Sequence, residues 1–487
     1  MDDNLYNLNF DTLLKYPDRD HFEIKNRYED NNPIPCSGFC TCCENELGLK
    51  AATPPLMSHG CSIDEIQKVL GVDKFDGGNE QPIMFLLENP GGNYGNGMPI
   101  GDKCPPVKHF YFSPNIKGKW PTTVEEIAKN PYGNYFAYLI YRYALNNVYI
   151  TNCIKCKYTG DVLYEKTKER CVKRYLKKEI DYFKPKIVIF FGHRAEHIFN
   201  DSKDLFPDFH GKTCYLWHPA TRRSRKNIIK HNNDLLDSFF IKDLMDRWYQ
   251  YCHDKWSDVF FVDDGPFPYY ERQKVKILFI GRELPGPIND VGDSRRISYI
   301  ENRLDMDKLG VFQSRLLYLA YGIHKRECDF SDWLKMDEAK ELNKIFASDG
   351  SFSCDQFSYA FMNASKLVNT QSKYVGDLFK KFIGDEVNRE FFIREIELLN
   401  PDIIVSGNLA DEGFFTGFEG IIKEDRDSIP WNDNCSVWQL KTDRMEKAIP
   451  WLDGHHFSAR KETFKKFYEP ICQAAKGVLD KKDVSIS

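Results

Sequence analysis

The chain has no apolar run long enough to cross a bilayer and no N-terminal segment of the secretory kind. None of its hydrophobic stretches approaches the roughly 20 residues that a membrane-spanning helix needs. Its start, Met-Asp-Asp-Asn, offers neither a basic segment nor an apolar core. We therefore expect a cytoplasmic protein with no membrane partner. In that compartment, 15 cysteines indicate reduced thiols and metal ligands instead of disulfides.

Acidic residues are scarce over one long stretch of the chain. Residues 101–230 carry 25 Lys and Arg against 12 Asp and Glu, whereas residues 1–100 carry 7 against 16. A basic block in an acidic chain indicates a face that binds a polyanion, although solvated helices would give the same counts. Four residues after a His-Pro pair are candidates for phosphate contacts, namely Arg222, Arg223, Arg225 and Lys226.

Short apolar runs alternate with helix-like stretches in both halves of the chain. They cover 82–87, 148–151, 186–191 and 213–217 in the first half, and 275–280, 359–362, 401–405 and a segment from 451 onward in the second. This alternation predicts parallel sheets with helices on both faces. Since the two halves repeat one plan, we expect an α/β fold of two tandem three-layer α/β/α domains. Each should have a central, mainly parallel sheet of about four strands.

The predicted domains cover residues 1–250 and 265–487. A chain of 487 residues is too long for a typical single domain. Proline and glycine gather in the segment Asp264-Gly265-Pro266-Phe267-Pro268, which favours a boundary near 245–270.

Polar strings follow the strands at the end where parallel sheets bind ligands. Glu88 and Asn89 stand before Pro90 and Gly91, Asn152 follows the second strand, and His218 follows the fourth. A carboxylate, an amide and an imidazole at such an edge can act as a proton acceptor, a reader of hydrogen-bonding groups and a hydrogen-bond donor. Each string also has an ordinary interpretation as a turn, a helix cap or a structural histidine.

Four cysteines have a pattern that can hold a metal. Cys40 and Cys43 form a C-x-x-C pair, and Cys156 and Cys171 follow the string that contains Asn152. Cys36 and Cys42 are competing ligands for the same site. Four thiolates also suit zinc.

The order of these motifs resembles the uracil-DNA glycosylase superfamily, in particular its iron–sulfur branch. The resemblance implies a 4Fe–4S cluster on the four cysteines, with zinc as the alternative, and DNA as the partner. It implies catalytic roles for Glu88 or Asn89 and for His218, and base recognition by Asn152. The iron–sulfur relatives place a stacking Phe where this chain has Ile100.

The resemblance implies hydrolysis of the N-glycosidic bond of a flipped base in DNA. Because Ile100 replaces a stacking ring, we expect the base to be a modified pyrimidine, such as a modified cytosine of phage DNA in antiviral defence, or else uracil. The alternative is a catalytically inactive DNA-binding sensor or scaffold that keeps the glycosylase fold.

The second half carries counterparts of the first-half motifs in the same order, namely Glu283, Asn363 and His456. It has no C-x-x-C pair and no cysteine directly after Lys366, so we expect it to lack the metal. An auxiliary role is favoured, for which self-association is one candidate.

Overall fold

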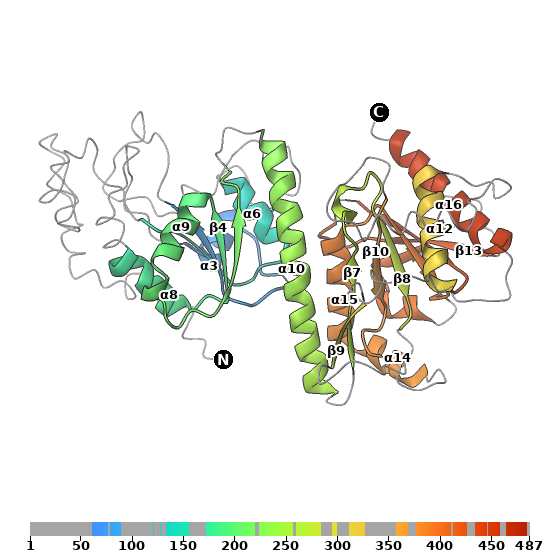
Figure 1. Cartoon of the computed structure of the whole chain (residues 1–487), viewed down its shortest axis with the longest axis horizontal. Helices are drawn as coiled ribbons and strands as arrows, with labels where there is room; N and C mark the ends of the chain where they lie inside the picture. The colour runs from blue at the N-terminus through green and yellow to red at the C-terminus, as the bar shows by residue number, and fades with distance from the viewer. Residues whose placement is uncertain are drawn as a thin grey trace, which may run out of the picture. The chain divides into compact units, whose positions relative to one another are not determined.

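The computed structural model of the chain describes residues 61–75, 78–88, 120, 127, 133–154, 172–219, 224–256, 260–283, 295–299, 311–326, 357–368, 376–410, 413–425, 434–445, 447–457 and 464–484. The chain divides into two compact units, Met1–Leu236 and Asp237–Ser487. The division lies within helix α10 (Arg225–Lys255), and the Gly- and Pro-containing segment after Asp264 lies inside the second unit (Figure 1). Within the described ranges, no helix is long and apolar enough to span a membrane.

The first unit is built on a five-stranded sheet. Its described elements are β1 (Cys61–Ser62), α3 (Ile63–Leu70), β2 (Ile83–Leu87), α6 (Gly133–Arg142), β3 (Val148–Asn152), η5 (Val172–Leu176), α8 (Lys177–Phe183), β4 (Ile187–Phe191), α9 (His193–Asp201), η6 (Lys203–Leu205), β5 (Lys212–Leu216) and the first part of α10. The strand order is β1-β3-β2-β4-β5. Four strands are parallel, and only β1 pairs antiparallel in this sheet.

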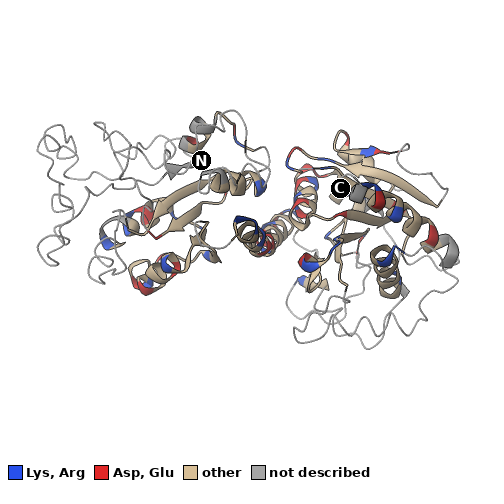
Figure 2. Ribbon diagram, turned by 90° about the horizontal axis from the view of Figure 1, so that it is seen from above, with Lys and Arg blue, Asp and Glu red and all other residues tan. Residues whose placement is uncertain are grey.

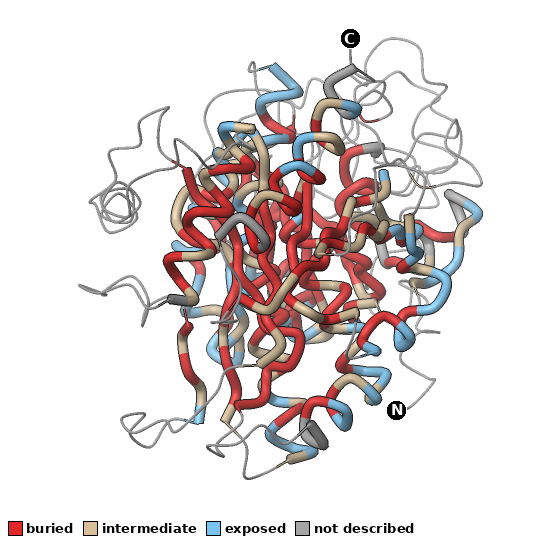
Figure 3. The backbone as a smooth tube through the Cα atoms, turned by 90° about the vertical axis from the view of Figure 1, so that its right-hand side faces the viewer, coloured by how far each residue is buried: buried red, intermediate tan, exposed pale blue. Residues whose placement is uncertain are grey.

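Helices cover both faces of the first sheet. Alternate residues of β2, Met84 and Leu86, share a core with Ile180 of α8 and Ile198 of α9. On the opposite face, Phe85 packs against α6, with its ring centroid 6.1 Å from that of Phe136. The sheet is therefore the middle of three layers, and its inner strands are buried (Figure 3).

The second unit is built on a seven-stranded sheet. After the rest of α10 it contains β6 (Phe261–Asp263), β7 (Gly265–Pro266), η7 (Tyr270–Arg272), β8 (Ile277–Gly281), β9 (Arg296–Ser298), α12 (Val311–Lys325), β10 (Ala360–Asn363), α14 (Gly376–Gly384), α15 (Glu386–Leu399), β11 (Ile403–Gly407), η8 (Phe414–Phe418), β12 (Ile422–Glu424), β13 (Cys435–Leu440), β14 (Ile449–Gly454) and α16 (Phe464–Val484). The strand order is β12-β13-β14-β11-β8-β10-β7, and β6 pairs with β9 separately.

The second sheet also lies between two helical layers. Phe279 of β8 and Val405 of β11 share a core with α12 and α16. On the other face, Trp451 of β14 contacts the rings of Phe392 in α15 and Phe415 in η8. The three inner strands of the first sheet and strands β8, β10 and β11 of the second carry no charged residue (Figure 2). The predicted α/β fold with two sheets is confirmed.

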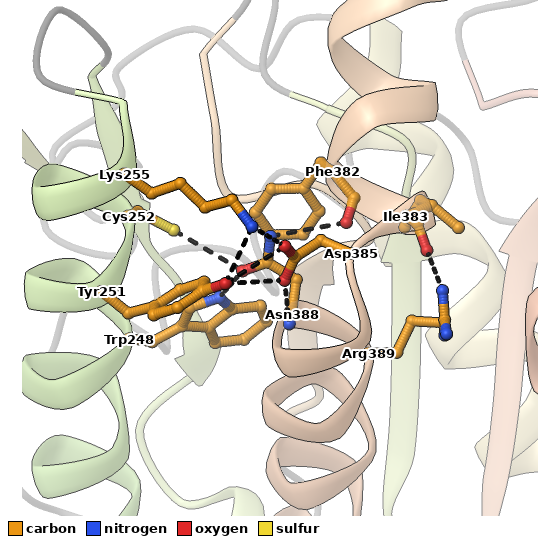
Figure 4. A network of polar contacts seen from close by, with 9 residues as sticks. All are labelled: Trp248, Tyr251, Cys252, Lys255, Phe382, Ile383, Asp385, Asn388 and Arg389. Atoms are coloured by element: carbon orange, nitrogen blue, oxygen red, sulfur yellow. Dashed lines mark hydrogen bonds and ion pairs between the residues drawn. The ribbon is translucent and has the colours of Figure 1, made fainter.

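The later part of α10 packs within the second unit, against the start of α15 (Figure 4). Asp385 caps α15 by accepting from the backbone N–H of Asn388 at 2.9 Å. It also accepts from the hydroxyl of Tyr251 at 3.1 Å and is ion-paired with Lys255. Trp248 donates its indole N–H to Asn388 at 2.8 Å. These bonds explain why α10 belongs to the second unit from Asp237 onward.

The two units share one topology. In the first, β3, β2, β4 and β5 are parallel neighbours with antiparallel β1 beside β3, and in the second, β10, β8, β11 and β14 are parallel neighbours with antiparallel β7 beside β10. Backbone hydrogen bonds recur at matching places. The bond from Cys153 N–H to Leu87 O matches that from Ala364 to Gly281, and the bond from Gly192 to Leu216 matches that from Asn408 to Gly454.

This register matches individual residues of the two units. Asn152 corresponds to Asn363 and His218 to His456, as the sequence predicts for this pair of motifs. Glu88 corresponds to Arg282, so Glu283 lies one residue beyond the register position of Glu88. The equivalent residues can therefore be compared directly.

Candidate functional site

The carboxyl ends of the parallel strands in the first unit bring the predicted motifs to one edge of the sheet. Asn152 ends β3, Glu88 follows β2, Gly192 follows β4, and His218 lies two residues after β5. Since these strands are adjacent, residues distant in the sequence become neighbours at the edge where such sheets bind ligands.

A pocket of about 330 Å³ opens at this edge. Its lining residues come from the ends of three strands and the start of α9, and they are Glu88, Phe191, Gly192, His193, Arg194, Ala195, Tyr215, Trp217 and His218. The volume lies at the lower end of the roughly 300–1,000 Å³ of small-molecule sites. The pocket thus brings together two predicted catalytic residues, Glu88 and His218. Asn152 is fully buried at the end of the adjacent strand and does not line the pocket.

An arginine that was not predicted contacts the Glu88 carboxylate. The Nη1 atom of Arg194, in the first turn of α9, lies 3.2 Å from Oε1 of Glu88. The side chain of Glu88 is 21% exposed, and that of Arg194 is 59% exposed. The ion pair therefore lies at the boundary between the pocket and solvent.

His218 is held close to the turn that follows β4. Gly192 has a φ of +98°, and a side-chain Cβ at that position would lie 3.2 Å from the Cβ of His218. A larger residue would therefore be both strained and crowded. Burial lowers the pKa of His218 to about 4, so the imidazole is neutral near pH 7 and offers one N–H donor.

The segment before His218 is fixed by a buried amide of α10. Asn232 accepts from the backbone N–H of Trp217 at 2.9 Å and donates to its carbonyl at 2.9 Å. The same amide donates to the hydroxyl of Tyr135 in α6 at 2.9 Å. The Trp217 indole also stacks on His231, with ring centroids 3.6 Å apart. Packing and hydrogen bonds thus define the backbone that presents His218.

Two histidines of α9 lie beside the pocket. The Nε2 atoms of His193 and His197 are 2.7 Å apart, and one must donate to the other. His193 also lies 3.6 Å from a carboxylate oxygen of Glu196. Within the part of the chain that the structure describes, no group of three or more His, Cys, Asp or Glu side chains could hold a metal ion.

The strand that ends at Asn152 is hydrogen-bonded to a buried carboxylate. Glu179 of α8 accepts from the hydroxyls of Tyr149 and Thr151, at 3.1 Å and 3.1–3.2 Å. Both donors are residues of β3, the strand that ends at Asn152. Glu179 therefore fixes this strand next to the residue that the sequence assigns to base recognition.

At the equivalent edge of the second unit, the polar side chains bond to one another. Asp264 accepts from the backbone and the side-chain amide of Asn363, at 2.6 Å and 3.0 Å. The same carboxylate is ion-paired with Lys366, whose Nζ lies 2.6 Å from Glu395. Burial opposes the charge on Lys366, but the two carboxylates outweigh it and hold its pKa above the ordinary value.

The second-unit counterparts of Glu88 and His218 also differ in their surroundings. Arg282 pairs with the adjacent Glu283 at 3.0 Å. His455, which precedes the His218 counterpart His456, contacts the side-chain oxygen of Asn434 at 3.1 Å.

Several predicted site residues lie outside the described residues. They are Asn89, Ile100, Arg222, Arg223 and the four predicted metal ligands, Cys40, Cys43, Cys156 and Cys171. Arg225 and Lys226 are described and form the exposed start of α10. The metal site and most of the phosphate-binding loop therefore stay predictions.

The residues that support the site, Arg194, Asn232 and Asp264, are not evident from the sequence patterns. Arg194 directly follows the Gly192 turn, where a strand-to-helix connection is evident from the sequence. Asn232 gives no such signal, because an Asn in the middle of a helix is usually a solvent-facing residue. The Asp264 interaction with Asn363 joins residues 99 positions apart.

Comparison with known protein families finds one similarity, over part of the chain. Residues 75–240 match the family model described as the Uracil DNA glycosylase superfamily. The matched segment contains all the lining residues of the pocket. No curated protein matches the chain.

Proposed function

We propose that the first unit is a DNA glycosylase, which hydrolyses the bond between a flipped base and its sugar. The proposal rests on one observation: Glu88 and a neutral His218 line the same pocket at the carboxyl edge of the sheet. The superfamily match over the same residues supports DNA as the substrate class.

The two residues suit opposite ends of the bond that breaks. Bond cleavage develops positive charge on the sugar and negative charge on the departing base. The Glu88 carboxylate can stabilise the cationic sugar or take a proton from water. A neutral His218 can donate its N–H to the base anion, and a donor of this kind is most effective where burial limits competing water.

Base recognition is assigned to Asn152 from its place at the end of β3, adjacent to the end of β2, although the residue is buried and does not line the pocket. A side-chain amide has both donors and an acceptor and can therefore pair with the edge of a pyrimidine. The rigid end of β3, supported by Glu179, limits the positions that this amide can take.

The proposed substrate is DNA with a modified pyrimidine, such as the modified cytosine of an invading phage, with uracil as the second candidate. Single-turnover release of free base should be measured by mass spectrometry from matched duplexes and single strands. These should contain uracil, 5-hydroxymethylcytosine or its glucosylated form. Fast release of uracil with none from the modified cytosines would leave a repair enzyme and end the antiviral proposal.

The same experiment tests the binding alternative. If the protein shifts DNA in a gel but releases no base and creates no alkali-labile site, it is a sensor or scaffold with the glycosylase fold. Replacing Glu88 by Gln should then leave every measured property except stability unchanged.

A structural 4Fe–4S cluster on Cys40, Cys43, Cys156 and Cys171 belongs to the proposal. When bound, it would tie the N-terminal segment to the region after Asn152 and take no part in the chemistry. Anaerobically purified protein should be brown and hold about four irons per chain. Colourless protein with stoichiometric zinc would show that the site is a zinc site.

We assign the second unit an auxiliary role, which includes self-association. Its Asn363 already donates to Asp264, and its counterpart of Glu88 is the cation Arg282. Sedimentation of the full chain, compared with a chain ending before residue 260, would detect association through this unit if the shorter chain stays folded by circular dichroism.

A further inference from the structure

We propose that Arg194 is a positioning residue that acts on the reaction only through Glu88. This assignment rests on the proposed function and adds a residue to its machinery. Arg194 would hold the Glu88 carboxylate in one orientation at the mouth of the pocket, so that the carboxylate meets the sugar without first losing rotational freedom.

The geometry supports this role. Glu88 follows the last residue of β2, so its side chain is attached to a rigid strand but has several rotatable bonds of its own. Arg194 is equally well anchored, in the first turn of α9. Their contact at 3.2 Å joins two elements that are 106 residues apart in the chain. Among the described residues, Arg194 has no other hydrogen-bonding or ion-pair partner that the structure records.

The second unit provides an internal comparison. At the register position of Glu88 it has Arg282, and at that of Arg194 it has Ala410. The carboxylate and its cationic partner are therefore absent together. Arg282 is ion-paired with the carboxylate of the next residue, Glu283. The backbone N–H of Ala410 donates to Asp453 at 2.8 Å. The joint replacement indicates that the two residues of the first unit work as a pair.

Stability alone does not account for this pair. Exposed ion pairs contribute little to folding, and Arg194 is more than half exposed. The competing role for an exposed arginine at this edge is a direct contact with a DNA phosphate, which would act on affinity. Positioning acts on the rate of the chemical step, so the two roles are separable.

The test is a double-mutant cycle on single-turnover base release with Glu88→Gln, Arg194→Gln and the double variant. Arg194→Gln should slow release about 10- to 100-fold, while DNA affinity and its salt dependence stay unchanged. In the Glu88→Gln background it should have no further effect, because it acts through the carboxylate. Arg194→Lys should restore part of the rate. Lys177→Gln is the matched control, since it breaks the exposed 2.7 Å pair with Asp181 on α8 and should leave release unchanged.

Three results would overturn the assignment. Independent effects in the double variant would show that Arg194 acts on its own. An unchanged rate with weaker binding and a salt slope reduced by about one would identify a phosphate contact. Finally, if the unsubstituted protein releases no base from any of the DNAs, the proposed function itself fails and this role fails with it.

Discussion

The two units share one backbone frame, but the polar residues at their strand ends have different surroundings. In the first, Glu88 and His218 line an open pocket. In the second, Asn363 and Lys366 form a buried network with Asp264. The two carboxylates that pair with Lys366, those of Asp264 and Glu395, are completely shielded from solvent. A shared topology therefore fixes where the strand ends lie but not whether their side chains meet a ligand or one another.

The largest effect should come from breaking the buried network of the second unit. Lys366→Met leaves the carboxylates of Asp264 and Glu395 without their cation and should lower the stability of this unit by about 3–5 kcal/mol. Chemical denaturation followed by circular dichroism measures the loss. Lys255→Met removes an exposed partner of Asp385 and should change the midpoint little. Equal losses from both variants would contradict the importance of the buried network.

The next largest effect is expected from His218, in comparison with His456, which follows the equivalent strand of the second unit. His218→Ala should slow base release by about 100-fold or more, the scale on which one donor to a developing anion acts. His456→Ala should leave the rate almost unchanged. Single-turnover kinetics on one substrate measures both. If His456→Ala abolishes release and His218→Ala does not, the catalytic unit is the second one.

A lowered pKa does not by itself distinguish the two units. Burial lowers the pKa of His324 in α12 to about 4, as it does that of His218. His324 packs beside Phe357, with ring centroids 5.7 Å apart, and its Nε2 lies 3.4 Å from the backbone carbonyl oxygen of Ser358. Of these two histidines, only His218 lines the pocket described above.

Both histidines should make stability depend on pH. Because the folded pKa lies below the usual value of 6.5, the unfolded chain takes up protons first as the pH falls. Their contribution is complete above pH 6.5, decreases between pH 6.5 and 4, and amounts to at most about 3 kcal/mol each. Denaturation midpoints from pH 8 to 4 should show this slope, and it should weaken in His218→Ala and in His324→Ala. An unchanged slope in either variant would contradict the assignment for that residue.

The sequence predicts the parallel strands of the two large sheets well, because these strands are short apolar runs that end in a polar or glycine-containing turn, whereas the antiparallel strand β13 was not predicted. The observed β2, β4 and β11 begin within two residues of the predicted runs. Short edge strands such as β1 and β7, with two residues each, give no such signal. They form because a neighbouring strand offers hydrogen bonds, which the local sequence does not encode.

The site is predictable only where its residues stand at strand ends. Glu88 and His218 follow apolar runs directly, so their place at one edge of a parallel sheet follows from the fold. Arg194 and Asn232 are helical residues whose partners lie far away in the chain, at separations of 106 and 97 residues. Contacts of this kind depend on how the helices pack on the sheet, and no local pattern specifies them.

The smallest effect is expected from a comparison of two adjacent residues of α10, Asn232 and Asn233. Asn232 and Asn233 each donate to a tyrosine hydroxyl of α6, at 2.9 Å and 2.8 Å, but only Asn232 also holds the backbone of Trp217. Replacing Asn232 by Ala removes both of its bonds to the partly buried backbone of Trp217 and should cost about 1–3 kcal/mol of stability. Because Trp217 precedes His218, base release should also slow, by about tenfold. Asn233→Ala should lower stability by about 1 kcal/mol and leave the rate unchanged. Denaturation and single-turnover kinetics on the two variants test both statements, and equal rates would show that His218 keeps its place without this amide.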